Sequence, residues 1–191
     1  MSTTILRAQN LGIVSFFLSV SFVIGVATAG KPLAVDQEVP SVQLPIAAAG
    51  GDSADDETID LAAVGADGKA VVMFLRGFPG YQCPLCSRQV SAWIKRADDF
   101  RKADIPVVFV YPGPNDQLHA KAEEFLRGTT LPAGMTLVLD PDYRATEAFG
   151  VRWDAPRETA YPSTFVIENG KVTKANVSRS HAGRTDPSFA L

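Results

Sequence analysis

The stretch Val71 to Gln89, VVMFLRGFPGYQCPLCSRQ, decides the fold. Residues 70–75 are continuously apolar, which is typical of a strand buried on both faces of a sheet. Residues 77–80 (GFPG) end that strand, and Cys83-Pro84-Leu85-Cys86 follows. From Pro84 onward apolar side chains recur at spacings of three and four, which predicts one amphipathic helix of about 18 residues. Its apolar face comprises Val90, Trp93, Ile94, Ala97 and Phe100.

The rest of the chain continues this alternation of strands and helices. Buried strands are predicted at 105–111 and 135–139, and helices at 117–127 and 143–149, with Gly150 placed as a C-terminal cap. Residues 163–178 predict a hairpin around Asn169-Gly170, the preferred two-residue turn. Apolar strands linked by helices imply an α/β fold with a sheet covered on both faces.

Composition is that of one ordinary globular domain. The chain has 191 residues, 46% hydrophobic and 20% charged, with a formal net charge of -3. No long basic stripe is present, and this argues against a nucleic-acid partner.

Residues 1–29 have the plan of a secretory signal peptide. Arg7 is the only charged residue among them, and the apolar stretch Ile13 to Val26 precedes the small-residue site Ala27-Thr28-Ala29. That stretch is shorter than the roughly 20 residues that span a bilayer core. We therefore predict an exported protein, periplasmic or secreted, cleaved after Ala29. A leader that stays as a membrane anchor and a buried helix of the fold are the alternatives.

Residues 30–60 predict an N-terminal lead-in strand followed by an acidic loop. Residues 35–46 carry an extended pattern broken by Pro40 and Pro45, and residues 50–57 (GGDSADDE) are turn-rich and acidic. A solvated loop explains this run of charges. A cation site is the alternative, although the carboxylates lack any recognised ligand spacing.

Cys83 and Cys86 are the chain's only cysteines, and they lie at a strand-to-helix junction. A bridge across so short a loop would stabilise the fold little. The N–H groups and dipole of a helix start favour an anion, so a thiol there ionises more easily than usual. Pro84 suits the first helical position. We predict that Cys83 is the attacking thiolate and Cys86 the resolving thiol, with positive charge from Arg76 and Arg88.

The cysteine pair has two other interpretations. In the first, the cysteines are simply buried hydrophobic residues. In the second, they are half of a zinc site to which only His119 and His181 could add imidazole ligands. Covalent haem attachment is excluded because Ser87 stands where that motif needs His. His119 is interpreted as a helix-surface residue and His181 as a loop residue. Trp93 is interpreted as a core residue and Arg157 as a solvated loop residue, with a thiolate-holding role as the alternative for Arg157.

Two segments together resemble the thioredoxin superfamily. They are Cys83–Cys86 after a buried strand, and residues 162–167 (PSTFVI) before Asn-Gly-Lys. The resemblance implies a thioredoxin-like fold with a central mixed β-sheet flanked by helices. It also implies that Pro162 forms a rigid cis turn beside the cysteines and helps to seat a partner's backbone. Thr164 and Arg76 are, with Pro162, the predicted supporting residues.

Within that superfamily the chain is most similar to the peroxiredoxin-like branch, the alkyl hydroperoxide reductase and thiol-specific antioxidant family. The similarity rests on the Arg-Gly before Cys-Pro-x-Cys, on residues 35–44 and on residues 140–151, and it covers about residues 34 to 185. We therefore assign 34–191 to a thioredoxin-like, peroxiredoxin-like domain. One departure is that Gly80 and Arg76 stand where typical peroxiredoxins have a peroxide-orienting Thr and a Pro.

The resemblance implies an oxidoreductase that needs no cofactor or metal. Its Cys83/Cys86 dithiol would reduce peroxides or protein disulfides, and an external thiol reductant such as a thioredoxin-like protein would reset it. Which of the two substrates it takes stays open. A copper-binding metallochaperone on the same fold, with His181 as third ligand, is the alternative. A redox-inactive binding module is a further alternative.

Overall fold

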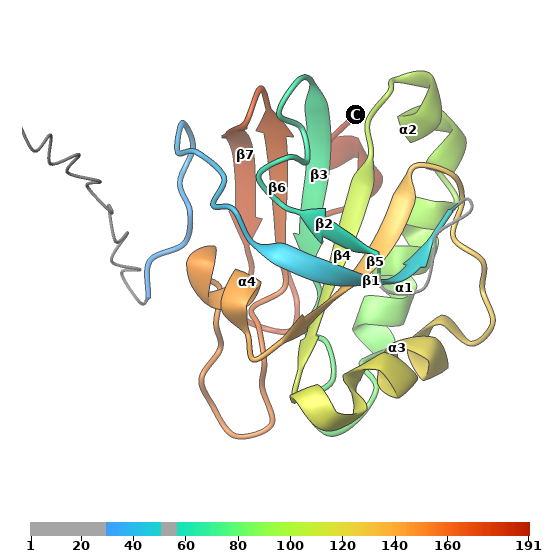
Figure 1. Cartoon of the computed structure of the whole chain (residues 1–191), viewed down its shortest axis with the longest axis vertical. Helices are drawn as coiled ribbons and strands as arrows, with labels where there is room; N and C mark the ends of the chain where they lie inside the picture. Colours follow the sequence, from blue (N-terminus) through green and yellow to red (C-terminus); the bar gives the residue numbers. More distant parts are fainter. Residues whose placement is uncertain (1–29, 51–56) are drawn as a thin grey trace, which may run out of the picture.

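The computed structural model describes residues 30–50 and 57–191; the predicted leader, 1–29, and most of the predicted acidic loop lie outside them. The described chain forms a seven-stranded sheet with helices packed against it (Figure 1). The strands are β1 Gln43–Ala49, β2 Thr58–Asp60, β3 Lys69–Phe74, β4 Val107–Gly113, β5 Met135–Pro141, β6 Ser163–Glu168 and β7 Lys171–Val177. The α-helices are α1 Pro84–Ile94, α2 Ala97–Lys102, α3 Leu118–Leu126 and α4 Arg144–Ala148, and short 3-10 turns lie at Asn115–Gln117 (η1) and Pro187–Phe189 (η2).

The sheet is mixed, and its strand order is β2-β1-β5-β4-β3-β6-β7. The central strands β3, β4 and β5 are parallel, and every other pairing is antiparallel. Parallel neighbours need crossover connections, and α1–α2 and α3 supply them. The predicted α/β class with a central mixed sheet is confirmed.

Both faces of the sheet are covered, as the continuous apolar strands required. Along β3 alternate side chains enter two cores: Val71 and Met73 pack with α1, α2 and α3 on one face, and Val72 and Phe74 pack with α4 on the other. All four are fully buried. The cysteines belong to the first core, so the helices that cover this face also position the chemistry.

The single long helix predicted from Pro84 is wrong, because the structure has two helices. α1 ends at Ile94, and Arg96 leaves helical geometry (φ -109°, ψ 14°) before α2 begins. Asp98 and Asp99 occupy the first turn of α2, where negative charge stabilises a helix start. The apolar face is nevertheless continuous across the break, because Trp93 stacks on Phe100 with ring centroids 5.1 Å apart.

The N-terminal prediction also needs correction. The lead-in strand begins only at Gln43 and includes Pro45, which pairs with Thr58 of β2, a short strand that the sequence pattern did not indicate. Between residues 30 and 42, only the bridge between Glu38 and Lys171 has strand pairing. Pro40 cannot donate a ladder hydrogen bond, and this is consistent with the later start.

The turn predictions are confirmed. Asn169 and Gly170 connect β6 to β7 with φ of 52° and 76°, the left-handed values that this hairpin turn requires. Gly150 follows α4 with φ of 64°. β4 extends two residues further than predicted, through Pro112 and Gly113, which stay in parallel register with the end of β5.

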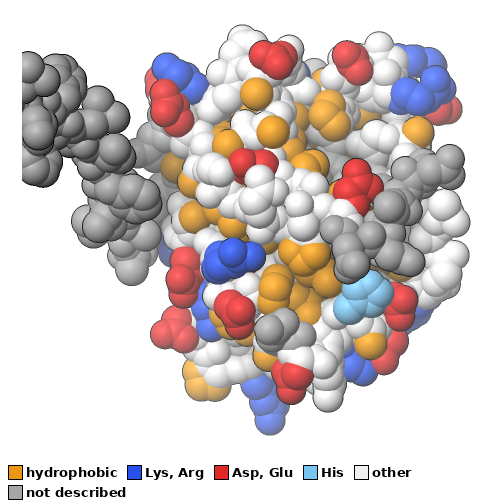
Figure 2. Space-filling view, in the orientation of Figure 1, with side chains coloured by type: hydrophobic (Ala, Val, Ile, Leu, Met, Phe, Trp, Pro, Cys, Tyr) orange, Lys and Arg blue, Asp and Glu red, His pale blue; other side chains and the backbone are white. Residues whose placement is uncertain are grey.

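The described surface mixes positive and negative side chains on the face seen in Figure 2. Within residues 30–50 and 57–191, no helix combines the length and the apolar character needed to cross a membrane.

Candidate active site

The loop between β3 and α1 carries the chain from the sheet to the cysteines. Gly77 has φ of 64°, and a Cβ at this position would lie 1.9 Å from the Pro112 carbonyl oxygen. Only glycine fits so close to the neighbouring strand, and the Phe78 N–H donates to that same carbonyl at 2.9 Å. The loop is thereby fixed against β4 before it reaches Cys83.

Cys83 is the N-cap residue of α1, and Pro84 occupies the first helical position, as predicted. The Cys83 sulfur accepts a hydrogen bond from the Cys86 backbone N–H at 3.3 Å, so it receives one of the free donors of the helix start. Both residues are free cysteines, with Cys83 4% exposed and Cys86 fully buried. The first sulfur is therefore the more accessible of the two.

The surroundings of the two sulfurs drive their pKa values apart. A hydrogen bond from the Cys86 thiol lowers the pKa of Cys83 to about 5 against the opposing effect of burial, and the Cys86 N–H and the charges of Arg184 and Arg76 add to it. Burial, followed by the thiol's bond to Cys83, raises the pKa of Cys86 well above its usual value. One sulfur is thus set up as a thiolate beside a protonated neighbour.

The second cation at the thiolate was not anticipated from the sequence. Arg184 belongs to the C-terminal loop, residues 178–186, and its Nη2 lies 3.7 Å from the Cys83 sulfur while Nη1 donates to Gln89 Oε1 at 2.9 Å. Arg88, which the sequence suggested for this role, is exposed on α1 and is not among the main causes of the lowered pKa of Cys83. Arg184 supplies the charge expected of Arg88.

Arg76 is buried, and a carboxylate neutralises it. Both its Nε and its Nη2 donate to the Glu158 carboxylate, and Nη2 also donates to the Tyr81 hydroxyl and the Arg157 carbonyl, each at 2.6 Å. Despite burial, the hydrogen bonds from Arg76 and His181 hold the pKa of Glu158 below its usual value. Arg157 itself is an exposed loop residue, as predicted, although its backbone helps to hold Arg76.

Glu158 also links the two loops that flank the cysteines. It lies in the Glu158 loop, residues 152–162, and its Oε1 is 2.9 Å from His181 Nε2 of the C-terminal loop. The His181 carbonyl accepts from Arg184 Nε at 3.2 Å, and the His181 ring contacts Trp153 at 5.1 Å between centroids. One carboxylate therefore holds Arg76 directly and holds Arg184 through His181.

The cis turn implied for Pro162 is not found. The Tyr161–Pro162 peptide is trans, as are all peptide bonds of the described residues. Even before proline the trans form is favoured by about 0.5–1 kcal/mol, and the Pro162 carbonyl accepts from the Ser178 N–H at 2.9 Å, so the chain enters β6 in an extended form. Pro162 is buried at the start of β6.

Thr164 is tied to the C-terminal loop. It is buried on β6, and its hydroxyl pairs with that of Thr185 at 2.7 Å. The Thr185 carbonyl in turn accepts from Gln89 and from the indole of Trp93, which is a core residue as predicted. Thr164 therefore helps to fix the C-terminal loop, and its hydroxyl bonds to Thr185 rather than to a sulfur.

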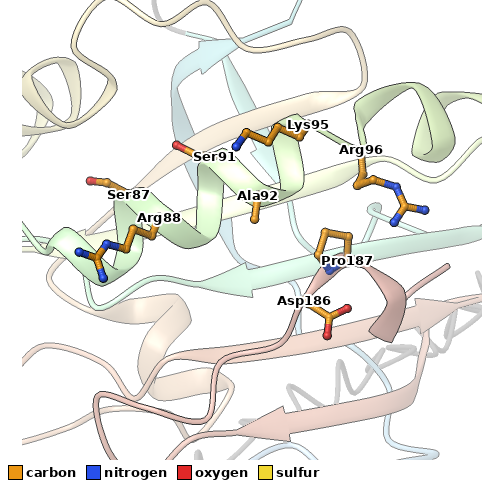
Figure 3. Close-up of a pocket in the computed structure, with 8 residues that line it drawn as sticks. All are labelled: Ser87, Arg88, Ser91, Ala92, Lys95, Arg96, Asp186 and Pro187. Carbon is orange, nitrogen blue, oxygen red and sulfur yellow. The ribbon is translucent and has the colours of Figure 1, made fainter.

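A cavity of about 630 Å³ lies between α1 and the segment that begins η2 (Figure 3). Neither cysteine lines it. One wall is formed by α1 and the junction between α1 and α2 and carries the cations, and the other is formed by the start of η2. The lining residues are Ser87, Arg88, Ser91, Ala92, Lys95, Arg96, Asp186 and Pro187. We call this cavity the α1 groove.

The remaining candidate ligands are not gathered around the sulfurs. His119 is exposed on α3 beside Glu123, and His181 is a loop residue whose ring faces Glu158, so both positional predictions are confirmed. In residues 30–50 and 57–191, no three His, Cys, Asp or Glu side chains are grouped as a metal site would require. Cys83 and Cys86 thus have a cationic environment without a third metal-ligating side chain.

A dithiol at the start of a helix, on a mixed sheet with helices on both faces, defines a thioredoxin-fold protein of the peroxiredoxin-like class. The fold is similar to that of several solved structures. Mycobacterium tuberculosis AhpC matches with a TM-score of 0.62 at 18% identity, covering 81% of this chain and 88% of its own. Enterococcus faecalis AhpC gives 0.64 at 13% identity, covering 82% and 88%. Peroxidoxin BcpB from M. tuberculosis gives 0.57 at 20% identity, covering 78% and 88%.

The family model described as "AhpC/TSA family" matches residues 35–175, and the chain belongs to that family. It is therefore a thiol-dependent oxidoreductase of the peroxiredoxin type. Peroxiredoxins act on peroxides and are reduced by thioredoxin-like proteins. A search of curated proteins gives no match.

Proposed function

We propose that the chain reduces hydroperoxides with Cys83 as the nucleophile and Cys86 as the resolving thiol. The observation that carries this proposal is the environment of the Cys83 sulfur: it accepts the Cys86 N–H at 3.3 Å and lies 3.7 Å from the Arg184 guanidinium. A thiolate is the reactive form of cysteine, and with a pKa of about 5 Cys83 is ionised at neutral pH.

The reaction transfers two electrons from the two sulfurs to the hydroperoxide. The Cys83 thiolate attacks the hydroperoxide, an S–O bond forms as the O–O bond breaks, and the alkoxide or hydroxide leaves and takes a proton. Cys83 is then a sulfenic acid. The Cys86 sulfur attacks the Cys83 sulfur, the S–S bond forms, and hydroxide leaves and takes up the Cys86 proton as water.

An external dithiol must then return two electrons to the Cys83–Cys86 disulfide. The environment that stabilises the Cys83 thiolate stabilises the reduced form, and this favours reduction of the disulfide by an ordinary thiol donor. We propose a thioredoxin-like protein as that donor.

Thiol–disulfide exchange with a protein substrate is the second candidate. Gly80 favours it, because the position at which typical peroxiredoxins carry a peroxide-orienting hydroxyl has no side chain here. The same Cys83 thiolate would attack a substrate sulfur in place of a peroxide oxygen.

The experiment compares the two reactions on the reduced full chain and on its Cys83→Ser and Cys86→Ser variants. Peroxide consumption faster than reduction of a protein disulfide, abolished in Cys83→Ser, supports the proposal. Mass spectrometry of Cys86→Ser after one peroxide equivalent should find Cys83 oxidised by one oxygen atom. Faster disulfide reduction would replace the proposal with the second candidate, and full activity of Cys83→Ser would refute both.

We also propose that the protein is exported, supported by the leader-like composition of residues 1–29. Fractionation of producing cells with N-terminal sequencing tests this, and a cytoplasmic protein that retains Met1 would contradict it.

The copper-binding alternative gains no support from the described residues, because His181 is bonded to Glu158. A copper titration of wild type against His181→Ala should reveal no high-affinity site that depends on His181.

A further inference from the structure

Four planar side chains form a row on the surface beside the active site. The Trp153 and Tyr161 rings stack with centroids 4.6 Å apart and planes 13° apart, and the Arg179 guanidinium lies 4.7 Å from the Tyr161 centroid. His181 contacts Trp153. Trp153 and Tyr161 are partly exposed, whereas Arg179 and His181 are exposed. The stacking holds these groups in place before any partner arrives.

The same two loops carry an excess of positive charge. Arg157 and Arg179 are exposed, and neither forms an ion pair with a carboxylate of the described residues. Of the three acidic residues of these loops, Glu158 binds Arg76 and His181, Asp154 pairs with Arg152, and Asp186, at the end of the C-terminal loop, accepts hydrogen bonds from Ser188. The chain as a whole has a net charge of -3, so this region opposes the overall charge.

The loops that carry this row of side chains also reach the cysteines. Arg184 of the C-terminal loop reaches the Cys83 sulfur, and Arg76 links the Glu158 loop to the segment before the cysteines. Two large apolar side chains next to Cys83 in sequence are exposed, Tyr81 at 45% and Leu85 at 39%. Trp, Tyr and Arg are the residues that contribute most binding energy in protein interfaces.

A protein that reduces the disulfide must place its own sulfur against Cys83. Its thiolate attacks the Cys83 sulfur, the Cys83–Cys86 bond breaks, and Cys86 leaves as a thiolate that takes a proton. A second partner thiol then attacks the partner sulfur of the mixed disulfide, so the partner is oxidised and Cys83 leaves as a thiolate. The surface around Cys83 is therefore covered by the partner during this exchange.

We propose that Trp153, Arg157, Tyr161 and Arg179, the arginine surface, dock an acidic segment of the dithiol protein that reduces the Cys83–Cys86 disulfide. This inference rests on the proposed function. Positive charge attracts the acidic segment and speeds its association, and the stacked rings give it a rigid apolar contact. The α1 groove is the competing surface, but its cations have acidic neighbours: Arg96 pairs with Asp99, and Asp186 lies in the opposite wall of the groove.

The test uses synthetic dithiol peptides as probes. Two peptides of equal length contain Cys-x-x-Cys flanked either by Asp and Glu or by Lys, and dithiothreitol serves as a small neutral dithiol. The rate of reduction of the oxidised full chain is measured with each, at low and at high salt. We expect the acidic peptide to react roughly tenfold faster than the basic one at low salt, and this advantage to shrink as salt is added.

Two double variants locate the surface. Arg157→Gln with Arg179→Gln should lower the acidic peptide's rate about fivefold relative to the dithiothreitol rate of the same variant. Arg88→Gln with Lys95→Gln, which removes the same charge from the α1 groove, should leave that ratio unchanged. A loss confined to the groove variant, or equal rates for the two peptides with wild type, would overturn the docking surface. Failure of dithiothreitol itself to regenerate two thiols would refute the proposed function instead.

Discussion

The cysteine segment, residues 76–86, and the two loops that face it contribute to one site in different ways. The segment acts through local backbone geometry: Cys83 caps α1, and its sulfur receives the N–H of a residue three positions later. The loops act through charge delivered from far along the chain, since Arg184 lies 101 positions from Cys83. The comparison shows that ionisation of Cys83 has a local component and a long-range component, which mutations can separate.

The largest expected effect comes from breaking the buried pair that joins the two parts. Arg76→Gln leaves Glu158 without its cation, and the side chains of the wild-type pair are only 4% and 10% exposed. We expect a loss of about 3 kcal/mol in the free energy of unfolding, measured with urea, because the largely buried Glu158 carboxylate then loses its guanidinium partner and keeps only its contact with His181. The double variant Arg76→Gln/Glu158→Gln removes that charge and should recover part of the loss. A single-variant loss below about 0.5 kcal/mol would show that the pair behaves like an exposed one.

The next effect isolates the long-range component at the sulfur. Arg184→Gln removes a cation from the thiolate and should raise the pKa of Cys83 by roughly one unit, a tenfold loss of thiolate at pH values below that pKa. The pH dependence of iodoacetamide alkylation measures this shift. Arg88→Gln removes an exposed cation of α1 as the matched control and should leave the pKa where it is. An equal shift in the two variants would mean that Arg184 has no special role.

The smallest effect tests whether Glu158 positions Arg184 through His181. His181→Ala removes the bond to Glu158 and the contact with Trp153 but leaves the Arg184 guanidinium intact. We expect the Cys83 alkylation rate near its pKa to fall roughly twofold, less than in Arg184→Gln, because the cation is present but less firmly held. A loss as large as that of Arg184→Gln would instead make His181 a principal determinant of the thiolate.

The cysteine segment can be predicted from the sequence better than the two loops that face it, and the reason is physical. Apolar periodicity and the helix-start position of Cys83-Pro84 are properties of neighbouring residues, so they identify α1 and the nucleophile. The break at Arg96 was missed because the apolar face continues across it through Trp93 and Phe100. Periodicity alone cannot distinguish one helix from two that bury the same face.

The distant residues that surround the thiolate cannot be predicted from local sequence patterns. Arg184 and Glu158 reach the site only because β6 and β7 bring their loops beside α1, and one sequence does not indicate which distant cation faces the sulfur. A partial signal existed for Glu158. Arg76 follows a fully buried strand, and a buried guanidinium requires a carboxylate, although nothing in the sequence selected Glu158 among the acids.

The most direct test of the account is a pH titration of both sulfurs in the reduced full chain. Alkylation by iodoacetamide at each pH, with the adducts assigned to Cys83 or Cys86 by mass, gives each thiolate fraction. We expect a midpoint of about 5 for Cys83, with its thiolate lost only as the pH falls through that value, and almost no reaction at Cys86 at neutral pH. Equal reaction at both sulfurs, with midpoints near the ordinary thiol value of about 8.5, would contradict it.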